Sequence, residues 1–158
     1  MTDEYTAWKA SQARPWAESV RKTVGRLRQR EAALEELTAR YDGLKATRYD
    51  KTGGASAGSD QMANMVSEMD AMRAQWFEAV ATWREEVDAF ENALRRMDAR
   101  HDQLLTARYL RDMPWAEVAD AMGYTETYVR GELLTNALGA LFDAMPPHLR
   151  AIPLAFEE

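Results

Sequence analysis

Residues 114–133 read PWAEVADAMGYTETYVRGEL and decide how the C-terminal third of the chain folds. Apolar residues recur at helical spacing as far as Gly123, a polar turn follows, and Thr125 is a suitable N-cap for a second helix. Glycine tolerates the left-handed backbone that a tight turn between two helices requires. The stretch therefore predicts a short helix, a turn at Gly123 and a second helix that runs to about Met145.

The spacing of small and aliphatic residues predicts that these two helices cross closely, as in a helix-turn-helix. Ala119 stands four positions before Gly123, where a small side chain lets the helices approach each other. Val129 stands six positions after the glycine and is the aliphatic residue that the second helix would bury against the first. A plain helical bundle with an incidental glycine turn is the alternative interpretation.

Residues 104–138, LLTARYLRDMPWAEVADAMGYTETYVRGELLTNAL, resemble the fourth region of the bacterial sigma-70 family, and still more the small phage and prophage proteins built on that region. The residues that carry the resemblance are Leu104, Leu105, Arg108, Tyr109, Trp115, Glu117, Val118, Ala119, Met122, Gly123, Tyr124, Val129, Ala137 and Leu138. Such proteins include regulators of late phage genes and of autolysin export. The resemblance implies a DNA-binding transcriptional regulator of phage or prophage type. RNA polymerase is a further candidate partner, as the protein that an adaptor without DNA binding would contact.

Helical geometry turns one set of side chains of the second helix toward a DNA major groove: Thr125, Glu126, Thr127, Tyr128 and Arg130, with Leu134 as a further candidate. Each has a purely structural alternative, as an N-cap, a partner of the helix dipole, a core residue or a solvated charge. Sigma-like recognition helices usually carry basic residues at the positions of Arg130 and Glu132. Glu132 therefore departs from the family pattern.

The acidic character of residues 114–133 argues against tight DNA binding by a single copy. Arg130 is the one basic residue there, against four acidic ones, and the whole chain carries a net charge of −6. Phosphate contacts provide most non-specific affinity for DNA and weaken with salt. We therefore predict weak binding to double-stranded DNA by a monomer, strengthened by dimerisation or by backbone contacts from the first helix. The backbone-contact candidates are Arg21, Lys22, Arg26 and Arg28, together with Arg30, for which a solvated or salt-bridged face is the alternative.

Two long segments with heptad spacing precede the predicted helix-turn-helix. Residues 15–46 form the first, with Pro15 in its opening turn, and residues 59–97 form the second, with Ser59 or Asp60 as its N-cap. Residues 14–51 hold ten Lys/Arg against six Asp/Glu, a balance of +4, whereas residues 59–97 hold four against eight, a balance of −4. Opposite charge favours pairing of the two helices. The predicted fold is all-α, with a long antiparallel coiled-coil helical hairpin followed by a C-terminal helix-turn-helix.

The second long helix carries bulky residues seven apart, Met69, Trp76, Trp83 and Phe90, with Met97 next in the series. Such large seam residues suggest that more than two helices meet, which predicts a homodimer or a higher oligomer. A stiff arm is the alternative. The predicted segments are 1–58, an N-terminal helix and Gly/Ser-rich connection; 59–97, the second coiled-coil helix; 98–145, the helix-turn-helix; and 146–158, an extended tail with Ile152, Leu154 and Phe156.

Composition excludes several other kinds of protein. The chain has no Cys and only two His, so we expect no metal, no cofactor and no catalysis. No apolar run approaches the length of a membrane span and the first residues do not read as a signal peptide, so we expect a cytoplasmic protein. The resemblance to phage and prophage proteins implies that the cell is a bacterial host. Two rival functions remain open: a small-terminase-like DNA-packaging factor, and a protein-binding adaptor whose helix-turn-helix no longer binds DNA.

Overall fold

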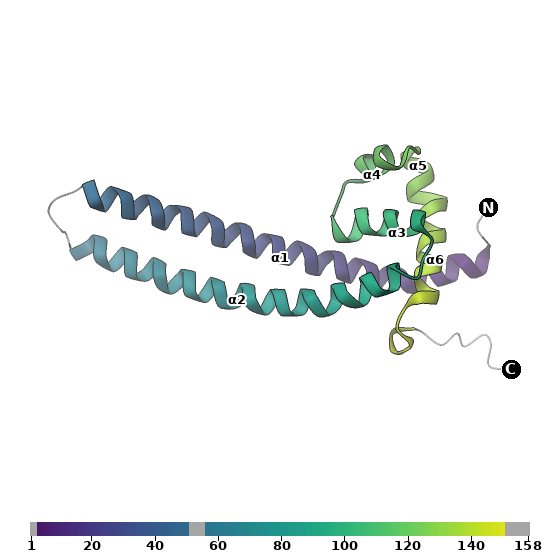
Figure 1. Ribbon diagram of the computed structural model, residues 1–158, viewed down its shortest axis with the longest axis horizontal. Helices are drawn as coiled ribbons and strands as arrows, with labels where there is room; N and C mark the ends of the chain where they lie inside the picture. The colour runs from purple at the N-terminus through teal and green to yellow at the C-terminus, as the bar shows by residue number, and fades with distance from the viewer. Residues whose placement is uncertain (1–2, 51–55, 151–158) are drawn as a thin grey trace. The chain divides into compact units, whose positions relative to one another are not determined.

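The computed structural model describes the backbone of residues 3–50 and 56–150 and the side chains of residues 3–47 and 60–150. Within these ranges the chain forms helices and turns and no β-strand, which confirms the all-α prediction. Two long helices come first, α1 (Glu4–Asp50) and α2 (Ser56–Leu94) (Figure 1). The predicted apolar tail residues Ile152, Leu154 and Phe156 lie outside the described residues.

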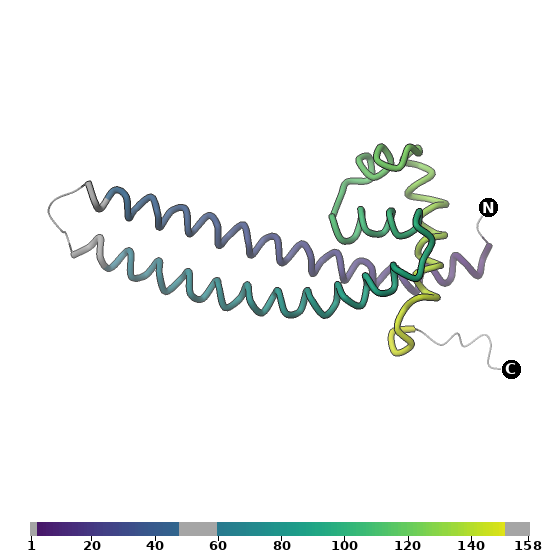
Figure 2. The backbone as a smooth tube through the Cα atoms, viewed as in Figure 1, coloured from purple at the N-terminus to yellow at the C-terminus, as the bar shows by residue number. Residues whose placement is uncertain are grey.

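Shorter elements follow α2 and make up the C-terminal part of the chain (Figure 2). They are α3 (Ala99–Leu105), the π-helical turn η1 (Thr106–Leu110), α4 (Trp115–Met122), α5 (Glu126–Tyr128), the π-helical turn η2 (Val129–Leu133), α6 (Leu134–Ala144) and the 3₁₀ turn η3 (Pro147–Leu149). Because α5, η2 and α6 follow one another directly, the helix predicted to begin after Thr125 runs from Glu126 to Ala144.

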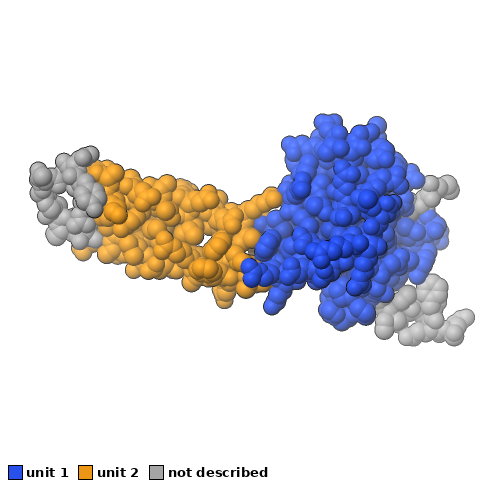
Figure 3. Space-filling view, in the orientation of Figure 1, with its two compact units in different colours: residues 1–24, 83–158 blue, residues 25–82 orange. Residues whose placement is uncertain are grey.

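The chain divides into two compact units, which Figure 3 shows in different colours. Unit 1 comprises residues 1–24 and 83–158, and unit 2 comprises residues 25–82. The first turns of α1 and the last turns of α2 therefore share a core with the short helices. The boundaries of these units differ from those of the predicted segments. The sequence pattern indicates where helices end, but it does not indicate which helices pack together.

Unit 1 has a continuous apolar core to which both long helices and the short helices contribute. The α1 side of this core consists largely of small residues, Ala10, Ala13 and Ala17, which let the neighbouring helices approach closely. Phe90 of α2 is fully buried, and its ring lies edge-on to Trp16 at 5.2 Å and to Tyr109 at 6.4 Å between ring centroids. Edge-to-face pairs of this kind add to the stability that burial alone provides.

Helix α1 begins at Glu4, well before the predicted start at Pro15, so that Pro15 lies inside the helix. The additional turns are held by tertiary contacts. The Trp8 ring lies edge-on to Phe142 at 5.4 Å, and Lys9 Nζ lies 2.8 Å from an Asp143 carboxylate oxygen. This packing offsets the backbone hydrogen bond that a proline removes from a helix.

Gly139 of α6 marks the closest approach of α6 to the start of α1. A methyl group added at Gly139 would lie 2.9 Å from Thr6 Cγ2 and 3.4 Å from the Thr6 carbonyl oxygen. We expect Gly139→Val to lower the free energy of unfolding by about 1–3 kcal/mol through overpacking. Gly131→Val is the matched control, because Gly131 is also helical but has open space around it. Urea denaturation followed by circular dichroism measures both, and an equal loss at the two positions would contradict the close packing of α6 on α1.

Unit 2 has a smaller core, formed by the middle parts of α1 and α2. Leu37, Met65 and Met69 are buried there, with Tyr41, Leu44 and Met72 packed against them. Arg30 donates a hydrogen bond to Gln75, and Trp76 donates one to Glu31. Residue numbers rise along one helix as they fall along the other, so the two segments are antiparallel within this unit (Figure 1).

The start of α2 also differs from the sequence prediction. Helix α2 begins at Ser56, before the expected caps Ser59 and Asp60. Asp98 occupies the N-cap position of α3, where its side chain makes no capping hydrogen bond.

Tyr109 carries a buried polar atom without a partner. Its hydroxyl and Arg108 Nε are the two buried side-chain atoms in the described part of the chain that make no hydrogen bond. Burial raises the pKa of the Tyr109 hydroxyl, since the phenolate would be poorly solvated there. We expect Tyr109→Phe to raise the free energy of unfolding by about 1–3 kcal/mol, because it removes an unsatisfied polar group. Urea denaturation tests this against Tyr124→Phe, a change at an exposed ring; a loss of stability in Tyr109→Phe would show that the hydroxyl is bonded in solution.

Candidate nucleic-acid interface

The turn between α4 and α5 is built as the sequence predicts. Gly123 ends α4 in the left-handed conformation, with φ of 75°. The Tyr124 N–H donates to the Ala119 carbonyl at 3.1 Å, which satisfies a carbonyl at the end of α4. Thr125 then caps α5, its hydroxyl accepting a hydrogen bond from the Tyr128 N–H at 3.3 Å.

The residues predicted to hold the two helices together are buried. Ala119 and Val118 of α4 lie in the core of unit 1, as does Val129 at the start of η2. Their burial fixes the side of the second helix that faces α4. The opposite side carries the candidate contact residues.

Most of the side chains predicted to contact DNA face solvent. Thr125, Glu126, Thr127 and Arg130 are exposed, whereas Tyr128 is half-buried and packs against the core. The prediction for Leu134 is wrong, because this side chain is 2% exposed. The π-helical turn η2 explains the difference, since its wider winding turns Leu133 and Leu134 inward together.

Arg130 sits within a small cluster of charged and aromatic groups. Its Nη1 lies 3.4 Å from Glu126 Oε1, and its guanidinium lies over the Trp115 ring, 5.9 Å from the ring centroid. The Arg108 guanidinium lies over the same ring at 4.5 Å, and Arg108 also donates to the Met113 carbonyl. Trp115 thus links the start of α4 to the exposed face of the second helix through cation–π contacts.

A second cluster lies at the turn and was missed by the sequence analysis. The Tyr124 and Tyr128 rings are 5.1 Å apart, and Arg100 of α3 hydrogen-bonds to Tyr124, which raises the pKa of Arg100. The spacing of four between the two tyrosines is a signal that could have indicated their contact. Arg100 gives no such signal, because it lies on another helix and only the fold brings it to this surface.

The five arginine and lysine residues proposed as backbone contacts are divided between the two units. Arg21 and Lys22 belong to unit 1, whereas Arg26, Arg28 and Arg30 belong to unit 2. Arg21 Nε lies 2.5 Å from Asp112, whose backbone is left-handed with φ of 53°, and this hydrogen bond raises the pKa of Arg21. The contact gives Arg21 a structural role in holding the end of η1. Lys22, Arg26 and Arg28 are exposed.

The four predicted seam residues contact other parts of the same chain. Met69 is buried in the core of unit 2 and Phe90 in that of unit 1. Trp83 is half-buried against the core of unit 1, and Trp76 is half-buried and bonded to Glu31. Their role in an oligomer stays a prediction.

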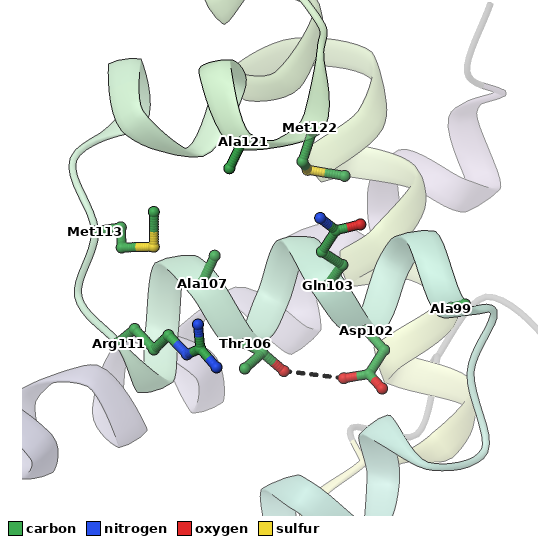
Figure 4. A pocket seen from close by; sticks show the side chains of 9 residues that line it. All are labelled: Ala99, Asp102, Gln103, Thr106, Ala107, Arg111, Met113, Ala121 and Met122. Carbon is green, nitrogen blue, oxygen red and sulfur yellow. Dashed lines mark hydrogen bonds between the residues drawn. The ribbon is translucent and has the colours of Figure 1, made fainter.

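A hollow of about 420 Å³ opens between α3–η1 and α4, lined by residues of both sides (Figure 4). Ala107 and Gln103 point across it toward Ala121 and Met122, and Met113 closes one end (Figure 4). Asp102 accepts a hydrogen bond from Thr106 at its edge. The hollow presents apolar and polar side chains together.

The described residues form neither a metal site nor a membrane span. No group of three or more His, Asp or Glu side chains is arranged to hold a metal ion in this part of the chain. Among the helices described, none combines the length and apolar character needed to span a membrane.

No protein family, no curated protein and no solved structure matches the chain.

Proposed function

We propose that the protein is a DNA-binding transcriptional regulator of the phage type, with α4 and the helix from Glu126 to Ala144 acting as a sigma-region-4-like helix-turn-helix. In this proposal α1 and α2 form a long antiparallel coiled-coil hairpin, and the second helix of the motif enters the major groove. One observation carries the proposal. The left-handed turn at Gly123 and the burial of Val129 leave a row of polar side chains exposed on one side of that helix: Thr125, Glu126, Thr127 and Arg130.

The exposed side chains suit the two kinds of contact that a DNA reader makes. Arginine donates to guanine O6 and N7, and threonine contacts bases through its hydroxyl or its methyl group. Arg100 and the Tyr124 hydroxyl are donors beside the turn, where they would bond to phosphate oxygens and fix the register. Arg130 and Thr127 would then provide direct readout.

The acidic surroundings set the expected strength of binding. Glu117, Asp120, Glu126 and Glu132 are exposed close in sequence to Arg130. Their repulsion of phosphate predicts micromolar or weaker binding by one copy, with steep salt dependence. A dimer would place two helix-turn-helix motifs on two half-sites of the DNA and raise affinity without any new kind of contact.

Selection of random duplex DNA by the purified full chain, at low and at physiological salt, tests the proposal. We expect an enriched motif, with two-fold symmetry if a dimer binds. If no motif is enriched at either salt concentration, the protein does not bind DNA sequence-specifically on its own, and the proposal is wrong.

A second function, docking of a protein partner such as RNA polymerase, is favoured by the hollow between α3–η1 and α4. Methionine side chains such as Met113 and Met122 adapt readily to an inserted apolar group. Ala121→Arg places a long charged side chain at the hollow. Loss of polymerase binding in this variant, with duplex selection unchanged, would support this function beside the first.

A further inference from the structure

Glu126 presents a carboxylate on the face that is proposed to approach DNA. Its side chain is 45% exposed and lies one helical turn before Arg130, which is 58% exposed, with 3.4 Å between Oε1 and Nη1. Both groups are therefore at the surface and linked to each other. Thr127 is exposed beside them, whereas Tyr128 is half-buried.

A purely structural role for Glu126 explains little of this arrangement. An exposed pair of opposite charges four residues apart contributes only slightly to helix stability. A carboxylate in the first turn of a helix gains a further small contribution from the helix dipole. Against these gains, the same negative charge repels every phosphate group that comes near, so Glu126 weakens binding to DNA of arbitrary sequence.

The major groove offers a group that would offset this repulsion. Cytosine presents its N4 amino group as a donor and has no major-groove acceptor of its own. Adenine presents an amino group next to the N7 acceptor, guanine presents two acceptors, and thymine presents an acceptor and a methyl group. A carboxylate accepts hydrogen bonds only, so cytosine suits it best. Adenine offers a donor but also the N7 acceptor, which would face the carboxylate, and guanine and thymine offer no donor.

We propose that Glu126 determines specificity by accepting a hydrogen bond from cytosine N4, while Arg130 donates to guanine O6 and N7 in a nearby base pair. This inference rests on the proposed DNA-binding function. Four residues of helix rise about 6 Å, which is comparable to the spacing of base pairs one or two steps apart, at about 3.4 Å per step. The Trp115 ring beside Arg130 supports the arginine in an orientation shared with Glu126.

The pairing of Glu126 with Arg130 also pre-organises the two side chains for DNA binding. Each charge restrains the other before DNA arrives, so fewer rotamers are lost on binding. On a site without the cytosine, the carboxylate keeps its charge but gains no donor. The same residue therefore weakens non-cognate binding and retains cognate binding, which increases the difference between the two.

Parallel selections of random duplexes by the full chain, Glu126→Gln and Glu117→Gln test the inference. Glu117 is an exposed carboxylate on α4, so its replacement removes the same charge without changing the reading helix. We expect the wild-type motif to contain a required cytosine near a guanine. Glu126→Gln should replace this cytosine preference with adenine, which glutamine reads through N6 and N7, and change the cytosine-to-adenine affinity ratio by about 5- to 150-fold. Glu117→Gln should keep the cytosine.

The outcomes separate the inference from the function on which it rests. An enriched motif that is identical for wild type and Glu126→Gln would overturn the role of Glu126 and leave the DNA-binding function standing. An equal change in Glu117→Gln would assign the effect to charge alone and also overturn it. Enrichment by none of the three proteins would overturn both. Circular dichroism of each variant checks that the helices are retained.

Discussion

Phe90→Ala is expected to lower the free energy of unfolding by about 3–5 kcal/mol, the largest effect that we predict for a single substitution. Phe90 is fully buried in unit 1 and contacts the rings of Trp16 and Tyr109. Its removal would leave a cavity between helices that are far apart in sequence. Urea denaturation followed by circular dichroism, at two protein concentrations, measures the loss.

Phe77→Ala is the matched control for this prediction. Phe77 lies on the same helix, α2, but is 64% exposed, so its replacement should cost well under 1 kcal/mol. Comparable losses in the two variants would contradict the assignment of Phe90 to the core of a single chain. A midpoint of the Phe90→Ala variant that rises steeply with protein concentration would instead indicate that this residue acts at an interface between copies.

Under the proposed function, Arg130→Ala is expected to weaken binding to a selected duplex by about 5- to 150-fold, because it would remove a cation that donates to a base. The loss should be largest at the guanine that Arg130 contacts, so specificity at that position should relax. Fluorescence anisotropy with labelled duplexes carrying each base at that position measures both effects.

Arg84→Ala provides the control for the loss of one positive charge. Arg84 is exposed on α2, outside the candidate interface. We expect its replacement to change affinity by less than about threefold and to leave base preference unchanged, since it removes at most a distant electrostatic contribution. Equal losses in the two variants would show that net charge, and no specific contact, governs binding.

The parts of the fold that local chemistry determines were predicted well. Gly123 ends α4 and Thr125 caps the next helix because backbone conformation and capping depend on neighbouring residues. The start of α1 was predicted too late, since Pro15 reads locally as a first-turn residue. Asp3 caps the earlier start, its carboxylate accepting a hydrogen bond from the Thr6 N–H at 2.6 Å, and this local signal was missed. Trp8 and Lys9 add contacts with α6, which no local pattern reveals.

The candidate site was predicted in part, for the same reason. The exposure of Glu126, Thr127 and Arg130 follows from helical periodicity in the first turns after Thr125. Leu134 was misplaced because the π-helical turn η2 shifts the phase of the helix, and a constant period cannot anticipate such a shift. Trp115 and Arg100 reach the surface through tertiary packing, so their contacts with Arg130 and Tyr124 could not be read from spacing.

We propose that the face of the second helix that carries Thr127 lies against bases in duplex DNA. The chain contains no cysteine, so Thr127→Cys introduces a unique attachment point for a short photo-crosslinker, and Ser67→Cys on α2 provides an exposed control. Irradiation with the selected duplex should join the Thr127→Cys protein to bases within the motif and leave the Ser67→Cys protein unlinked. Crosslinking that is absent at Thr127, or equal at the two positions, would contradict this placement of the second helix on DNA.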